Sequence, residues 1–156
     1  MSDSLKKEFW DRMEETRAGM LATEGGRAVP MSHYVERDAN TLWFITANGT
    51  DLAKTAQTGA AAEYLISSAS ESLYARIDGT VQAVTDPQKL DDLWSAVAAA
   101  WFEDGRKDDD IQLIRFDMTE AEVWATGGSM SFLYEVARAN ITKETPNVSD
   151  HGVIRF

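Results

Sequence analysis

The chain of 156 residues carries 26 acidic and 15 basic side chains, which gives it a formal net charge of −11. This charge repels the phosphate backbone of nucleic acids and the anionic surface of the cytoplasmic membrane leaflet, so neither is expected as a partner. The chain has no cysteine, and this excludes disulfides, thiolate nucleophiles and thiolate metal ligands.

The first predicted element is an amphipathic helix over residues 1–17. Leu5, Phe9 and Met13 recur every fourth residue among charged neighbours, which is the spacing of one helix face. The first residues, MSDSLKKEFW, lack the apolar core of a signal peptide, and no apolar run in the chain approaches the length of a membrane span. We therefore expect a cytoplasmic protein.

Strand patterns separated by turn residues follow this helix. Gly25-Gly26 has the composition of a tight hairpin turn, and residues 37–40 form a second turn. Three antiparallel strands are expected around these turns, at residues 19–24, 28–35 and 41–46.

A short helix at residues 51–58, closed by Gly59, separates these strands from the later ones. Gly79 interrupts the alternation of its strand, so we expect a bulge or a sharp bend there, and a bent strand lets a sheet curl. A further helix begins at Asp86-Pro87 and a last one is capped by Ser129. The later strands are expected at residues 61–67, 72–85, 111–117 and 120–126.

The sum of these elements is six or seven strands, with helices inserted between them or placed at the ends. Helices and strands do not alternate as βαβ units, so the pattern favours an antiparallel barrel over a doubly wound parallel sheet. We assign one domain to residues 1–156, with the helix at 1–17, the barrel at 18–126, and a C-terminal helix and tail at 127–156.

The stretch from Phe44 to Lys54 is predicted to form a strand, a tight loop and a helix start. The Thr50 hydroxyl, the first N–H groups of the helix and Lys54 could together surround a phosphate. Alternatively, Thr50 only caps the helix and Lys54 is a surface charge. Asp51 favours the second interpretation, because a carboxylate on the first turn repels a dianion.

The strand around Pro30 is a second candidate. Proline lacks the N–H that a ladder needs, so this strand either leaves main-chain groups free to face a ligand or forms a twisted edge that closes a barrel. Trp101 and Trp124 could stack on a flat heterocycle, or could lie in the core or in a dimer interface. Neither histidine lies in a metal-ligand pattern, so no metal site is expected.

Taken in order, these pieces resemble the pyridoxamine 5′-phosphate oxidase-like flavin-binding split barrels, specifically the bacterial general stress protein branch. The resemblance covers nearly the whole chain and is most distinctive in LWSAVAAAWFEDGRKDDDIQLIRFDMTEAEVW. It implies a mainly β fold, a six-stranded antiparallel split barrel with peripheral helices, that forms a homodimer. It also implies FMN, rather than FAD or a deazaflavin, in each of two clefts at the dimer interface.

The resemblance further implies which residues bind the cofactor. The strand after Arg27 would line the flavin ring and ribityl chain beside its neighbouring strand, and the helix start would take the phosphate. Aromatic and basic residues late in the chain would lie near the ring or phosphate, partly from the partner subunit. The implied set is Arg27, Val29, Pro30, Met31, Ser32, Ile45, Thr46, Thr50, Lys54, Trp101, Lys107 and Trp124, and no catalytic residue is assigned.

The implied function is a flavin-binding general stress protein, and one form of it is an oxidoreductase that acts on a small molecule. The alternative is a non-catalytic flavin carrier or sensor, or a dimeric interaction module without a ligand. The oxidase itself offers adjacent Arg and Lys to the phosphate, whereas this chain has one Lys and an Asp. Its C-terminal W…R-L-H-D-R substrate motif is also absent, so oxidation of pyridoxamine phosphate is not expected.

Overall fold

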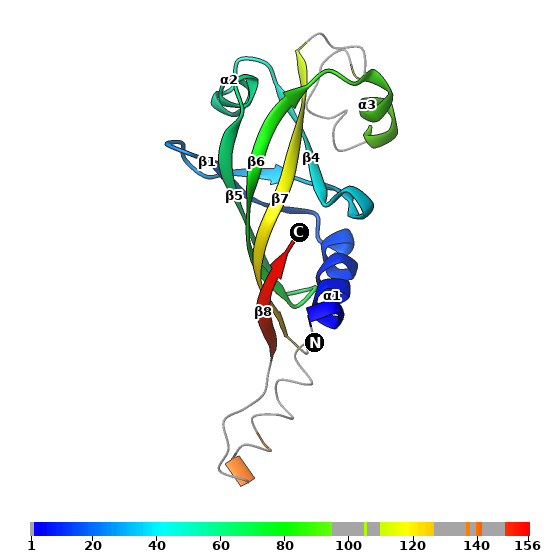
Figure 1. Ribbon diagram of the computed structural model, residues 1–156, viewed down its shortest axis with the longest axis vertical. Helices are drawn as coiled ribbons and strands as arrows, with labels where there is room; N and C mark the ends of the chain where they lie inside the picture. The colour runs from blue at the N-terminus through cyan, green and yellow to red at the C-terminus, as the bar shows by residue number, and fades with distance from the viewer. Residues whose placement is uncertain (1, 95–104, 106–109, 127–136, 138–139, 142–148) are drawn as a thin grey trace.

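The computed structural model describes residues 2–94, 105, 110–126, 137, 140–141 and 149–156 (Figure 1). These residues form an antiparallel sheet of eight strands with α-helices around it. The helices are α1 (Ser2–Glu15), α2 (Asp51–Gln57) and α3 (Pro87–Leu93), with a 3-10 helix η1 (Arg37–Ala39). The strands are β1 (Ala18–Thr23), β2 (Val29–Ser32), β3 (Tyr34–Glu36), β4 (Thr41–Ala47), β5 (Ala60–Ser68), β6 (Leu73–Val84), β7 (Ile111–Thr126) and β8 (Ser149–Arg155).

Helix α1 buries the apolar stripe that the sequence predicts. Phe9 and Met13 are fully buried, and Leu5 is 9% exposed. The helix lies beside β8, and its Phe9 ring is 5.9 Å from the ring of Phe156, which directly follows that strand (Figure 1). The N-terminal helix therefore covers part of the barrel core, as expected.

The order of the strands, β2-β1-β5-β6-β7-β4-β3, puts two consecutive pieces of chain at opposite ends of the sheet. Strand β2 ends at Ser32 and strand β3 begins at Tyr34, so only His33 separates them. Because one residue joins the two ends, the sheet has to curl until its edges meet. The described residues thus form the split barrel that the sequence predicts.

The prediction of one strand over residues 28–35 is wrong. The segment is divided at His33, so its first part pairs with β1 and its second part with β4. The His33 side chain turns into the core and is only 7% exposed. Its Nδ1 lies 2.6 Å from the Tyr64 hydroxyl, and its Nε2 lies 3.0 Å from the Met13 carbonyl oxygen. These long-range partners break the strand.

The two strands predicted at residues 111–117 and 120–126 are one continuous strand, β7. It pairs with β6 along most of its length, with β4 up to Asp117, and with β8 from Glu120 onward. Strand β8 lies in the segment assigned to a C-terminal helix and tail. The divided segment and β8 raise the strand number above the six expected. Most of the predicted last helix, and residues 95–101 of the predicted third helix, lie outside the described residues.

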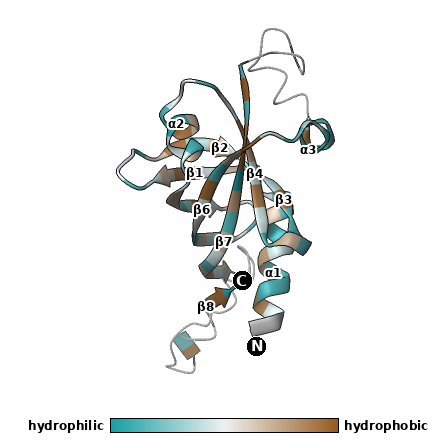
Figure 2. Ribbon diagram, turned by 45° about the horizontal axis from the view of Figure 1, so that its top comes forward, coloured by the Kyte–Doolittle hydropathy of each residue, from teal (hydrophilic) through white to brown (hydrophobic). Residues whose placement is uncertain are grey.

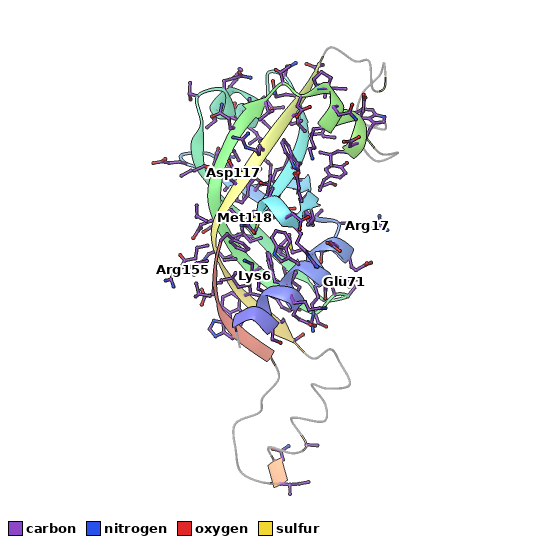
Figure 3. The ribbon with its side chains drawn as sticks, turned by 45° about the vertical axis from the view of Figure 1, so that its right-hand side comes forward. Lys6, Arg17, Glu71, Asp117, Met118 and Arg155 are labelled. Atoms are coloured by element: carbon purple, nitrogen blue, oxygen red, sulfur yellow. The ribbon has the colours of Figure 1, made fainter. Side chains whose placement is uncertain are left out.

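Gly79 produces the irregularity that the sequence predicts. The register between β6 and β7 shifts between Asp78 and Gly79, and the extra residue on β7 is Thr119, whose hydroxyl donates to the Asp78 carbonyl at 3.0 Å. A Cβ at Gly79 would collide with the Asp117 carbonyl oxygen. Asp117 and Met118 mark this place midway along β7 (Figure 3). The bend therefore requires glycine.

Alternating side chains fill the barrel. Hydrophobic and hydrophilic residues alternate along β6 and β7 (Figure 2). The rings of Phe44, Tyr64 and Phe116 meet inside, with centroids 5.0 Å apart for the first pair. None of the helices in the described part of the chain is long and apolar enough to cross a membrane.

We expect Gly79→Ala to lower the free energy of unfolding by about 1–3 kcal/mol, because the added methyl group forces the two strands apart. Urea denaturation followed by circular dichroism measures this change. Thr80→Ala, at an exposed position of the same strand, is the matched control and should stay within about 0.5 kcal/mol of the wild type. Equal midpoints for both variants would contradict the close approach.

The buried His33 should make stability depend on pH. Burial lowers the pKa of its imidazole below 6.5, so the unfolded chain takes up a proton more readily than the folded one. This contribution is complete above pH 6.5 and is lost as the pH falls through the folded pKa. Unfolding measured from pH 7.5 down to 5.5 should show a steeper loss in the wild type than in His33→Gln. Parallel curves would argue against a buried neutral ring.

Candidate functional site

Thr50 caps helix α2, as one of the two interpretations of this stretch proposed. Its hydroxyl oxygen accepts from the Ala53 N–H at 3.1 Å, and its hydroxyl hydrogen goes to the Ala47 carbonyl at 3.0 Å. The Thr46 hydroxyl lies 3.4 Å away. Because the hydroxyl hydrogen of Thr50 is already donated, Thr50 orders the loop rather than offering that hydrogen to a ligand.

Two basic side chains, one on helix α2 and one in the β1–β2 hairpin, have no acidic partner among the described residues. Lys54 on α2 and Arg27 in the β1–β2 hairpin are both exposed, and neither forms an ion pair in the part of the chain that the structure describes. The hairpin adjoins the start of β5, where the Glu24 N–H donates to the Ala61 carbonyl at 3.0 Å. Helix α2 leads into the same start of β5, so both cations lie toward one end of the barrel.

Polar side chains of the sheet hold α2 in place. The Gln82 side chain on β6 donates to the carbonyl oxygens of Ala56 and Gln57, at 3.1 and 3.3 Å. The Gln57 amide in turn donates to the Gln112 side chain of β7 at 3.2 Å. These contacts fix the C-terminal end of α2 on the sheet, and the Thr50 cap fixes its start.

Strand β2 is an edge strand, which confirms one consequence expected of Pro30. In the described residues it pairs with β1 alone, in a register that sets Pro30 opposite Met20. Val29 and Pro30 are exposed, whereas Met31 and Ser32 are half-buried. Strand β2 also contacts β4, which carries the half-buried Ile45 and Thr46. The two strands that carry these predicted residues are thus neighbours, but Met31 packs on the main core and Ile45 on a separate cluster around Trp43.

Trp124 lies apart from these residues within one chain. Thr46 pairs with Gln112 on β7, and Trp124 is twelve residues further along the same strand, roughly 40 Å at the usual rise of a strand. Its ring stacks on His151, with centroids 4.8 Å apart and an angle of 6° between the planes. Trp101 and Lys107 lie outside the described residues.

The sequence interpretation missed exposed apolar side chains on the outer face of the barrel, in a row that one ion pair interrupts. Met20 on β1 and Leu65 on β5 are opposite each other, and each is 39% exposed. The register continues this row through Arg76 and Glu122 to Val153, which is 44% exposed. The sequence contains a signal for this row, because Met20 and Leu65 are apolar at positions that the alternation of their strands places on the outside.

Tyr64 was also missed, and no sequence signal distinguishes it from an ordinary core residue. Its hydroxyl lies 2.9 Å from the Met31 carbonyl oxygen and 2.6 Å from His33 Nδ1. Burial raises the pKa of the Tyr64 phenol, so it stays protonated at neutral pH. Among the described residues, no group of three or more His, Asp or Glu side chains could hold a metal ion.

Known proteins share both the sequence pattern and the fold. The family model described as pyridoxamine 5′-phosphate oxidase like matches residues 4–147. The structure is similar to that of a candidate general stress protein 26 from Jannaschia sp. CCS1, with 43% identity, 99% of each chain covered and a TM-score of 0.92. A comparison with curated proteins found no match.

A second similar structure is the general stress FMN/FAD binding protein from Xanthomonas citri. It shares 31% identity, the match covers 81% of this chain and 92% of that one, and the TM-score is 0.74. The family match spans most of the chain, and both relatives are general stress proteins. The chain therefore belongs to the pyridoxamine 5′-phosphate oxidase-like family of split barrels, in its general stress protein branch.

Proposed function

We propose that this chain is a cytoplasmic flavin-binding general stress protein that holds FMN where β2, β4 and the start of α2 come together. The observation that carries the proposal is that Arg27 and Lys54, two cations without an ion-pair partner among the described residues, lie toward the end of the barrel where β5 starts. The relative from Xanthomonas citri, named as an FMN/FAD binding protein, supports the choice of a flavin.

The residues present fit such a group. A phosphate monoester carries close to two negative charges at neutral pH, and Arg27 and Lys54 supply two positive ones. The outer edge of β2, from Val29 to Ser32, has no ladder partner in the described part of the chain and would offer main-chain groups to a polar heterocycle, beside Ile45 and Thr46 of β4. Thr50 keeps the phosphate end of the site ordered through its cap.

A bound flavin supplies the redox chemistry, and the protein binds it, orients it and limits the access of water. No described residue of this site is needed as a general acid or base. We infer an oxidoreductase that acts on a small molecule. A carrier or sensor is the second candidate, and Asp51 favours it, because this exposed carboxylate on the first turn of α2 reduces the positive charge available to the phosphate.

We also propose a homodimer that buries the apolar outer face of the barrel. Met20, Leu65 and Val153 are large hydrophobic side chains exposed on that face. In a two-fold dimer the same patch of each subunit meets its copy, so one apolar row can cover the other. Such a dimer is also the way for Trp124 of one subunit to approach the flavin held by the other.

The flavin assignment predicts the behaviour of Lys54→Ala. Loss of a charge-assisted bond should weaken FMN binding by about tenfold or more, measured by quenching of flavin fluorescence. Lys7→Ala is the matched control, because Lys7 is exposed on α1 and paired with Asp11. Equal affinity in both variants would show that the phosphate lies elsewhere. Reduction of the bound flavin by NADH or NADPH, followed by reoxidation with turnover, separates an enzyme from a carrier.

The dimer assignment predicts the behaviour of Leu65→Asp. A carboxylate in the apolar row should convert the dimer to a monomer of normal fold, because an unpaired charge is costly to bury. Sedimentation velocity measures the mass, and circular dichroism checks the fold. Glu71→Asp, in the turn between β5 and β6, is a control that should leave the mass unchanged. A monomeric wild type, or a Leu65→Asp variant that stays dimeric, would contradict the proposed interface.

A further inference from the structure

Four groups form a series of polar contacts inside the barrel. The Met13 carbonyl oxygen of α1 lies 3.0 Å from His33 Nε2, and His33 Nδ1 lies 2.6 Å from the Tyr64 hydroxyl. That hydroxyl lies 2.9 Å from the carbonyl oxygen of Met31 on β2. These polar contacts thus link α1, the junction of β2 and β3, strand β5, and the edge strand β2 that we assign to the flavin.

The number of hydrogens available for these polar contacts depends on whether the His33 ring is neutral or protonated. A carbonyl oxygen only accepts, so Nε2 carries a hydrogen that it donates to Met13. In the neutral ring Nδ1 therefore has a lone pair and needs the hydrogen of the Tyr64 hydroxyl, which leaves none for Met31. In the protonated ring Nδ1 donates to the hydroxyl oxygen, and the hydroxyl hydrogen then goes to the Met31 carbonyl.

We propose that His33 is a positioning residue for the flavin-lining strand, because its proton decides whether the Tyr64 hydroxyl gives its hydrogen to His33 or to the Met31 carbonyl of β2. The role of β2 toward a flavin rests on the function proposed above. The exchange of hydrogen bonds rests on the distances alone.

The barrel is built to allow this contact. Tyr64 projects from β5 under β1 to reach β2, and the residue of β1 that it passes is Gly19, which is opposite Met31. A Cβ at Gly19 would lie 2.8 Å from the Tyr64 ring, so a side chain there would displace the ring. The glycine of β1 therefore leaves room both for the phenol and for the Leu65 carbonyl oxygen, which a Cβ would approach to 2.5 Å.

The surroundings of the ring contain no competing charge among the described residues. Helix α1 faces it with main-chain groups of Met13 and Thr16, and β5 faces it with the Tyr64 phenol. No acidic or basic side chain is in contact with it there. Burial without a countercharge lowers the pKa of His33, so the change of hydrogen bonding falls in the acidic range below 6.5.

The test is the carbonyl ¹³C shift of Met31 in the ligand-free protein, followed by NMR from pH 8 to pH 5 beside the ring signals of His33. In the wild type the two should titrate together. In Tyr64→Phe, which keeps the ring and loses the hydroxyl, the Met31 shift should be flat while His33 still titrates. In His33→Gln the side-chain amide offers one donor group and one acceptor in place of the neutral ring. The Met31 shift should be independent of pH in this variant as well.

Either of two results would overturn the proposal: a Met31 shift that stays flat in the wild type, or one that titrates unchanged in Tyr64→Phe. A His33 ring that remains neutral down to pH 5 would overturn it too. Circular dichroism establishes that each variant is folded, and His33→Gln gives a second comparison if Tyr64→Phe is not.

Flavin binding provides a separate measurement. At pH 5, where a protonated His33 leaves the Tyr64 hydrogen to the Met31 carbonyl, FMN should bind folded Tyr64→Phe about fivefold more weakly than the wild type, because β2 loses that hydrogen bond. Unchanged affinity would overturn the positioning role of the contact. If the wild type binds no flavin, the proposed function fails, and the Met31 shift still decides whether His33 controls the hydrogen bond to β2.

Discussion

The split barrel depends on one covalent constraint, the single residue His33 between the two edge strands of the sheet. Because β2 and β3 belong to opposite edges, no flat arrangement of the eight strands satisfies the chain. The curl brings β2 beside β4 and leaves the outer edge of β2 without a ladder partner among the described residues. The candidate flavin site is therefore a consequence of how the barrel closes.

Local signals predicted the elements that local contacts determine. The Thr50 cap bonds the N–H three residues ahead, and Asp86 caps α3 in the same way through Lys89. The bend at Gly79 follows from a missing side chain in an alternating strand. The division of the strand at His33 could not be predicted this way, because its partners Tyr64 and Met13 are 31 and 20 residues distant in sequence.

The sequence could single out individual residues as candidates for the site, but it could not predict how far apart they lie in the fold. Pro30 indicated an edge strand from residue type alone, whereas the place for an anion at the helix start with Lys54 stays a prediction. Sequence spacing gives no measure of the distance between Trp124 and this group, because that distance depends on the register of a single long strand. The outer row depends on register in the same way, since its apolar members Met20, Leu65 and Val153 come from three different strands.

Strand β7 changes one of its neighbours halfway along, from β4 to β8, and this has a consequence for synthesis of the chain. Residues 120–126 leave the ribosome before residues 149–155, which cover one of their two edges. Until then, the nascent barrel presents an open strand edge, which is a template for pairing with another molecule. The pairing with β8 thus covers this edge of β7 and removes that template.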